Sequence, residues 1–188
     1  QGTVIYLALE DGQRSIQSRL ASLDCAPPPN LLFFDTWSMG ADAVEDLRSS
    51  IEEHRPRLVV IDVFVKVQDP TQTSSRNVYQ KDYAEVAAFQ QLSEETGTAI
   101  VLVTHTRKAP STDTFDKVMG TSGVTGAADT IITLDKTRFQ TSATLSIASR
   151  IMERDREETM RLDDSGWTLL EEHEAAEAQQ SGERQEVL

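Results

Sequence analysis

Three largely apolar runs, each followed by a polar residue with useful chemistry, constrain the fold of this sequence more than any other feature. The runs cover residues 4–9, 58–61 and 100–104, and the residues that follow them are Glu10, Asp62 and His105. Apolar runs without polar alternation are typical of strands buried on both faces, as in parallel sheets. Open α/β sheets bind their ligands where the carboxyl ends of the strands meet. We therefore expect one site at that edge, with all three polar residues in it.

The segments between these runs have the spacing of amphipathic helices. Predicted helices cover residues 13–23, 42–54 and 79–96, and further short strands are predicted over 31–34 and 130–134. This alternation predicts an α/β fold, a parallel sheet flanked by helices. Beyond it, the segments 144–148, 159–162 and 167–170 predict antiparallel C-terminal hairpins that extend the sheet. We expect residues 1–170 to form one core and residues 171–188 to be a disordered acidic tail.

Composition excludes some classes of protein. The one cysteine, Cys25, rules out an internal disulfide and favours a reducing compartment, which we expect to be the cytoplasm. No apolar run approaches the roughly 20 residues that span a bilayer, so we expect no membrane association. The net charge is −13, and the six Glu and one Arg of residues 171–188 contribute −5 of it, leaving −8 for the body. An acidic body is unsuited to passive coating of nucleic acid, although a local basic loop remains compatible with it.

Each strand-end residue has both a chemical and a structural interpretation. Asp62, after four aliphatic residues, has the form of a Walker-B aspartate that holds Mg²⁺, but an aspartate there can also cap the next loop. Glu10 can orient and deprotonate a water, or it can begin a turn and cap the following helix. His105 can donate to a terminal phosphate, or its ring can be satisfied by backbone groups. Their equivalent positions favour a shared site.

The ordered set of segments resembles the RecA-like ATPases of the AAA type, in particular the branch of plasmid RepA-type hexameric replicative helicases. The matching segments are residues 4–11 with Arg19 and Leu20, 58–62, 100–108, 120–129, 153–155 and 166–170. No single segment is highly specific. Their order and spacing, which cover nearly the whole chain, carry the resemblance.

The resemblance implies roles for individual residues. Glu10 would activate the attacking water, Asp62 would hold Mg²⁺, and His105 would sense the phosphate of ATP. The loop within residues 106–123 would bind nucleic acid, expected to be single-stranded DNA. The residues expected to touch the phosphate backbone are Arg107, Lys108 and Lys117.

The resemblance also implies a homo-oligomer, expected to be a hexameric ring. Arg154, with Arg150 as a less favoured choice, would reach the ATP of a neighbouring subunit as an arginine finger. These arginines and Arg156 alternate with acidic residues, so a solvated charge network is an equally good interpretation.

One motif of the family is not found. No stretch reads G-x-x-x-x-G-K-[ST], the loop whose backbone cradles phosphates. The resemblance implies a strand, this loop and a helix ahead of residue 1, with that strand between the ones that end near His105 and begin at Thr130. We therefore expect the 188 residues to be most of an ATPase domain and not to hydrolyse ATP measurably by themselves.

Two other functions stay open. One is a non-catalytic RecA-like module for assembly or regulation that has lost nucleotide binding. The weaker one is an unrelated phosphotransfer receiver with Asp62 as the acceptor. It lacks an early acidic pair apart from Glu10 and Asp11, and the C-terminal hairpins do not suit it.

Overall fold

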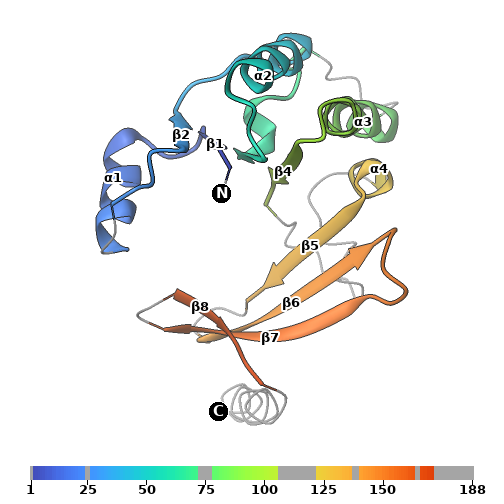
Figure 1. The fold of residues 1–188 in the computed structure, drawn as a ribbon. Helices are drawn as coiled ribbons and strands as arrows, with labels where there is room; N and C mark the ends of the chain where they lie inside the picture. Colours follow the sequence, from blue (N-terminus) through green and yellow to red (C-terminus); the bar gives the residue numbers. More distant parts are fainter. Residues whose placement is uncertain are drawn as a thin grey trace. The chain divides into compact units, whose positions relative to one another are not determined.

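The structure, a computed structural model, describes residues 2–23, 26–71, 78–105, 122–136, 140–163 and 166–171. Among these, the residues up to Ala128 form one compact unit and those from Asp129 onward form a second. Figure 1 shows both units, with most of their helices and strands labelled. Each unit is described by itself.

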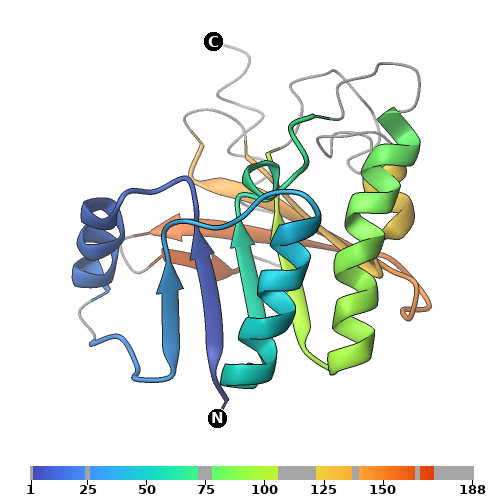
Figure 2. The same ribbon diagram turned by 90° about the horizontal axis from the view of Figure 1, so that it is seen from above.

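The first unit is built on a sheet of four parallel strands in the order β2-β1-β3-β4. The strands are β1 (Val4–Ala8), β2 (Leu31–Phe34), β3 (Leu58–Asp62) and β4 (Ala99–Val103). Ala8 pairs with Asp62, and Asp62 pairs with Val103. The segments that follow β1, β3 and β4 therefore leave the sheet at one edge, towards which all four arrows point in Figure 2.

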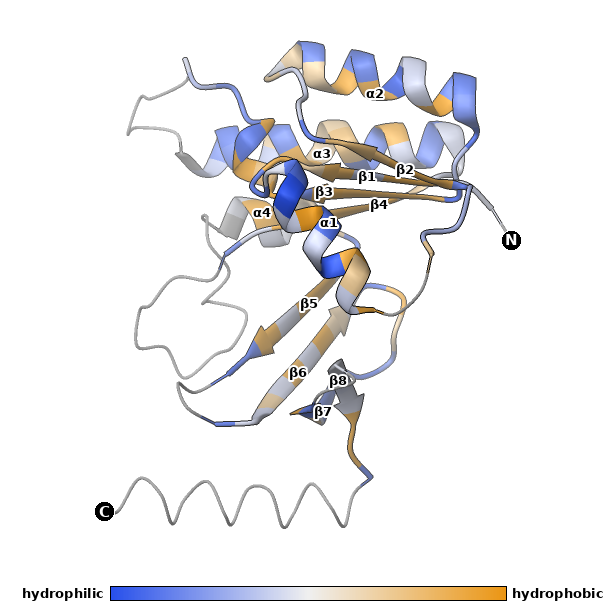
Figure 3. Cartoon of the chain, turned by 90° about the vertical axis from the view of Figure 1, so that its left-hand side faces the viewer, coloured by the Kyte–Doolittle hydropathy of each residue, from blue (hydrophilic) through white to orange (hydrophobic). Residues whose placement is uncertain are grey.

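Among the described residues the first unit has five helical elements, two of which cover one face of its sheet. The elements are α1 (Gln13–Ser22), α2 (Ala41–His54), the 3₁₀ helix η1 (Phe64–Lys66), α3 (Val78–Thr96) and α4 (Ser122–Ala127). Leu47 of α2 and Leu92 of α3 join Ile5 and Ile61 of the strands in a core from which solvent is excluded. Figure 3 shows the strands hydrophobic along their length, with α2 and α3 on one side of them. Burial of these side chains stabilises the packing of α2 and α3 on the sheet.

The second unit is an antiparallel sheet in sequence order. Its strands are β5 (Thr130–Asp135), β6 (Ser142–Ser149), β7 (Arg156–Asp163) and β8 (Gly166–Leu169). The predicted antiparallel hairpins are confirmed. In the described part of the chain they form a four-stranded sheet of their own, without a hydrogen-bonded ladder to β4. Gly166, with φ of 114°, has a backbone conformation that suits glycine.

The structure differs from the sequence prediction at α4, which was not expected. Gly123 and Gly126 lower the helix propensity of this segment. Packing overrides this, because Ala127 is buried in the core and Val124 packs against it. No helix among the described residues is long and apolar enough to cross a bilayer. The predicted tail lies outside the described residues from position 172 onward.

Candidate active site

Glu10 and His105 meet at the carboxyl edge of the parallel sheet. Glu10 lies two residues beyond β1, His105 lies two residues beyond β4, and β3 lies between these strands. Even so, Glu10 Oε2 is 3.2 Å from His105 Nε2. The contact therefore bridges the end of β3, which is Asp62. The expected convergence of the three residues at one edge is what the structure shows.

The contact between Glu10 and His105 is open to solvent. The Glu10 side chain is 53% exposed and that of His105 is 64% exposed. Ion pairs of this exposure contribute about 0–1 kcal/mol to stability. A ligand can therefore replace the contact at little cost to the fold, which suits residues that bind and release a substrate.

The turn after Glu10 is held by its neighbour. Asp11 Oδ2 is 2.6 Å from Arg19 Nη1, and Ser15 Oγ donates to Asp11 Oδ1 over 3.1 Å. The N-cap of α1 is Gly12, and no side chain caps this helix by a hydrogen bond. Glu10 is therefore not used as a helix cap, and Asp11 carries the structural role in this pair of carboxylates.

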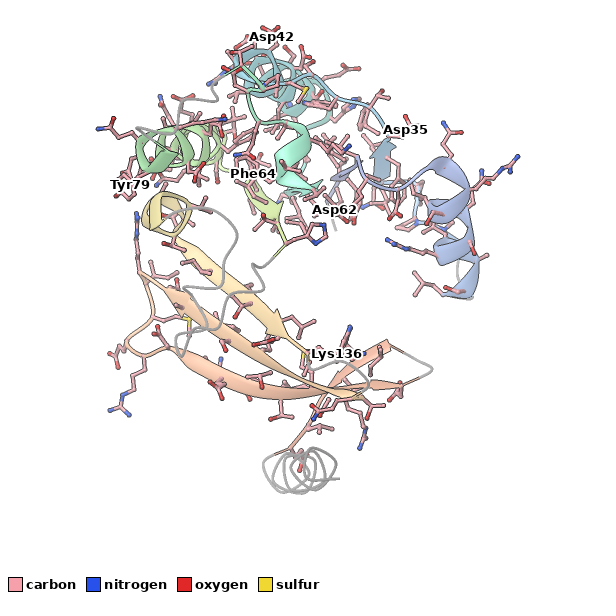
Figure 4. All side chains as sticks on the ribbon, turned by 180° about the vertical axis from the view of Figure 1, so that it is seen from behind. Asp35, Asp42, Asp62, Phe64, Tyr79 and Lys136 are labelled. Atoms are coloured by element: carbon pink, nitrogen blue, oxygen red, sulfur yellow. The ribbon has the colours of Figure 1, made fainter. Side chains whose placement is uncertain are left out.

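Asp62, labelled in Figure 4, is held from two sides. Its carboxylate Oδ2 accepts a hydrogen bond of 2.6 Å from the hydroxyl of Tyr6, and its backbone oxygen accepts one of 2.6 Å from Leu9 N–H. Burial, and then the Asp62 carboxylate, raise the pKa of Tyr6 to about 12. The phenol is therefore protonated at neutral pH and acts as the donor. The peptide bond after Asp62 is cis.

The site fits Mg²⁺ bound together with a phosphate ligand better than a metal held by protein alone. Among the described residues, no three His, Cys, Asp or Glu side chains lie together as a metal cage requires. Mg²⁺ in nucleotide sites typically takes one or two carboxylates and completes its shell with water and phosphate oxygens. Asp62, a half-buried carboxylate at a strand end, matches that requirement.

The arginines of the second unit differ in their partners. Arg150 Nη1 is 3.7 Å from Asp129 Oδ1, and Arg156 Nη2 is 3.4 Å from Glu158 Oε1. Arg154 is exposed in the turn between β6 and β7 and forms no ion pair with a described residue. The charge-network interpretation therefore holds for two of the three arginines and leaves Arg154 available.

The structure adds one residue to the predicted site, and it does not describe the three cations predicted to bind nucleic acid. Arg107, Lys108 and Lys117 lie outside the described residues. Tyr6 was not singled out from the sequence, although a signal was present. Side chains alternate along a strand, so Tyr6 shares a sheet face with Ala8, the register partner of Asp62.

Comparison with known proteins agrees with this architecture. Residues 1–111 match the protein family described as an AAA domain. Over 90% of its length the chain is similar to a structure described as the ATPase domain of G40P, with a TM-score of 0.68, 12% identity and 75% of that chain covered. Over 90% of its length it is also similar to the RadB recombinase, with a TM-score of 0.64, 12% identity and 80% coverage of that chain. No curated protein matches the sequence. The structural similarity confirms the expected RecA-like fold.

Proposed function

This chain belongs to the AAA domain family, and from this membership we propose that it is a RecA-like ATPase domain of the helicase type. The observation that carries the proposal is the contact of Glu10 with His105 across the strand end that bears Asp62. Hydrolysis of a phosphoanhydride requires a general base, a hydrogen-bond donor to the phosphate and a metal-binding carboxylate at such an edge. The phosphate-binding loop of such ATPases is not among the 188 residues. The assays use the protein at its full native length.

Each residue of the proposed site has a separate role in this reaction. Glu10 orients the attacking water and takes its proton, while His105 exchanges its contact with Glu10 for one with a γ-phosphate oxygen. Asp62 would hold Mg²⁺ when it is bound. When bound, Mg²⁺ would offset the negative charge of the phosphates. Arg154 of a neighbouring subunit adds a second positive charge near the γ-phosphate.

The proposal predicts that Asp62→Asn raises the magnesium concentration needed for ATP hydrolysis by about 10–100-fold, a loss typical for residues that support a bound metal. The amide cannot supply the negative charge that a metal-bound water favours. The measurement is phosphate release as a function of Mg²⁺ concentration at saturating ATP.

Asp35→Asn is the matched control for Asp62→Asn. Asp35 follows β2 as Asp62 ends β3, and its carboxylate accepts a hydrogen bond from Gln13 over 2.7 Å. This variant is expected to keep the magnesium dependence of the wild type. A full-length wild type without magnesium-dependent hydrolysis would instead favour the non-catalytic assembly module.

We further propose a cytoplasmic homo-oligomer, a hexameric ring, that binds single-stranded DNA through the loop carrying Arg107, Lys108 and Lys117. The support is the adjacent pair of cations Arg107 and Lys108 in an acidic chain, and their place directly after His105. A loop in that position links a nucleic-acid contact to the phosphate site.

Replacing both Arg107 and Lys108 with Ala is expected to weaken binding of single-stranded DNA to a similar extent for all sequences. Each lost phosphate contact reduces the slope of log K against log salt by about 0.7. The measurement is fluorescence anisotropy of a labelled oligonucleotide at several salt concentrations. Arg14 and Lys66, two exposed cations of the first unit, provide a control double variant of equal charge. An unchanged slope in the Arg107 and Lys108 variant contradicts the proposal.

A further inference from the structure

Tyr6 contacts Asp62, the candidate metal-binding residue, although it does not itself lie at the end of a strand. It lies on β1, where it pairs with Val60 of β3, two residues before Asp62. Its hydroxyl reaches diagonally along the sheet to Asp62 Oδ2 at 2.6 Å. This distance is at the short end for an O–H···O bond, as is typical when the acceptor is charged.

The geometry of this bond restricts the Asp62 carboxylate. The backbone of Asp62 is fixed by the ladder to Ala8 and by the bond from Leu9 N–H. What remains free is rotation of the carboxylate about its side-chain bonds. A donor on Oδ2 selects one orientation, and no side chain among the described residues bonds Oδ1. Oδ1 is then the oxygen that can face a metal-bound water.

Tyr6 has a rigid base from which to do this. The neighbouring β1 residues Ile5 and Leu7 are completely buried, so the strand cannot shift relative to β3 without opening the core. The Tyr6 ring itself packs against Phe33 of β2, with ring centroids 5.6 Å apart. A ring packed against Phe33 places its hydroxyl more reproducibly than a flexible donor such as lysine would.

We infer that Tyr6 is a positioning residue that orients the Asp62 carboxylate for binding of Mg²⁺ with ATP. The inference rests on the proposed function, because it assigns to Tyr6 an effect on the metal through Asp62. Tyr6 itself touches neither the metal nor the phosphates in this assignment. Its removal should therefore weaken metal binding while leaving the metal-independent part of nucleotide binding intact.

The test is Tyr6→Phe, which removes the hydroxyl and keeps the ring. Binding of Mn²⁺ in the presence of a non-hydrolysable ATP analogue is followed by the loss of the free Mn²⁺ signal in electron paramagnetic resonance. The dissociation constant for Mn²⁺ is expected to rise about tenfold, as for other residues that orient a metal ligand. The affinity for the same analogue in EDTA is expected to stay within twofold of the wild type.

Tyr83→Phe is the matched control, because Tyr83 is an exposed tyrosine of α3 that stacks on Tyr79. It should bind Mn²⁺ as the wild type does. The double variant Tyr6→Phe with Asp62→Asn should bind Mn²⁺ no more weakly than Asp62→Asn alone, since Tyr6 acts through that carboxylate.

The outcomes separate the inference from the function on which it rests. Mn²⁺ binding by Tyr6→Phe equal to that of the wild type, or additive losses in the double variant, overturn the positioning role and leave the ATPase proposal standing. Unchanged Mn²⁺ binding in Asp62→Asn, or none in the wild type, overturns the metal site and the positioning role together.

Discussion

Glu10→Gln is expected to reduce the rate of ATP hydrolysis by the full-length native protein by about 10²–10⁴-fold, the usual contribution of a positioned general base. Glutamine has the size of glutamate and can still hydrogen-bond to His105, but it cannot take a proton from water. The affinity for ATP should therefore change little while the rate falls. Steady-state phosphate release and equilibrium binding of a non-hydrolysable ATP analogue measure the two effects separately.

Glu53→Gln provides a closely matched control for Glu10→Gln. Glu53 is also an exposed glutamate beside a histidine, with its Oε1 3.9 Å from His54 Nε2, but it lies at the end of α2. An exposed change of this kind usually alters stability by less than about 0.5 kcal/mol, and we expect wild-type hydrolysis. The general-base role is wrong if Glu10→Gln keeps more than a tenth of the wild-type rate.

The parallel sheet could be predicted because its strands are continuous apolar runs in the sequence. Val59 and Ile61 face the helices, yet Val60 between them is also apolar, so the run has no polar alternation that would suggest an antiparallel strand. The end of α3 was equally readable, because Gly97 has the positive φ of 65° that a helix terminus favours. Both signals depend only on neighbouring residues, so they can be recognised in a single sequence.

Only those residues of the site that lie at strand ends could be predicted from the sequence. Parallel strands end at one edge, so Glu10, Asp62 and His105 were expected together. The pairing of Tyr6 with Asp62 depends on the register between β1 and β3, which the sequence does not specify when nearly all positions of both strands are apolar. Likewise, the ion pair of Arg150 with Asp129 depends on how β5 and β6 pair.

Arg154→Ala is expected to lower the rate of ATP hydrolysis by about 10³–10⁵-fold, the contribution of known arginine fingers. A guanidinium near the γ-phosphate offsets charge that develops in the transition state, so ATP binding should be retained. The turn between β6 and β7 suits this role, because Arg154 is exposed there and Ile151 in the same turn is 90% exposed. Arg150 suits it less, because its own backbone N–H and side chain are both engaged by Asp129. Arg156→Ala, a change of equal charge in the same hairpin, is the control and should keep activity.

Mixing of two inactive variants distinguishes an arginine that acts in trans from one that acts within its own subunit. In an assembly of Glu10→Gln and Arg154→Ala subunits, some interfaces combine an intact Glu10 from one subunit with an intact Arg154 from the next. Hydrolysis should then recover in proportion to the fraction of such interfaces, with a maximum near equal amounts of the two variants. The measurement is phosphate release across mixing ratios, with co-assembly verified by affinity capture of differently tagged subunits. Co-assembled mixtures that remain as inactive as either parent would show that Arg154 does not complete the neighbour's site. Its loss of activity would then have to come from the hairpin itself.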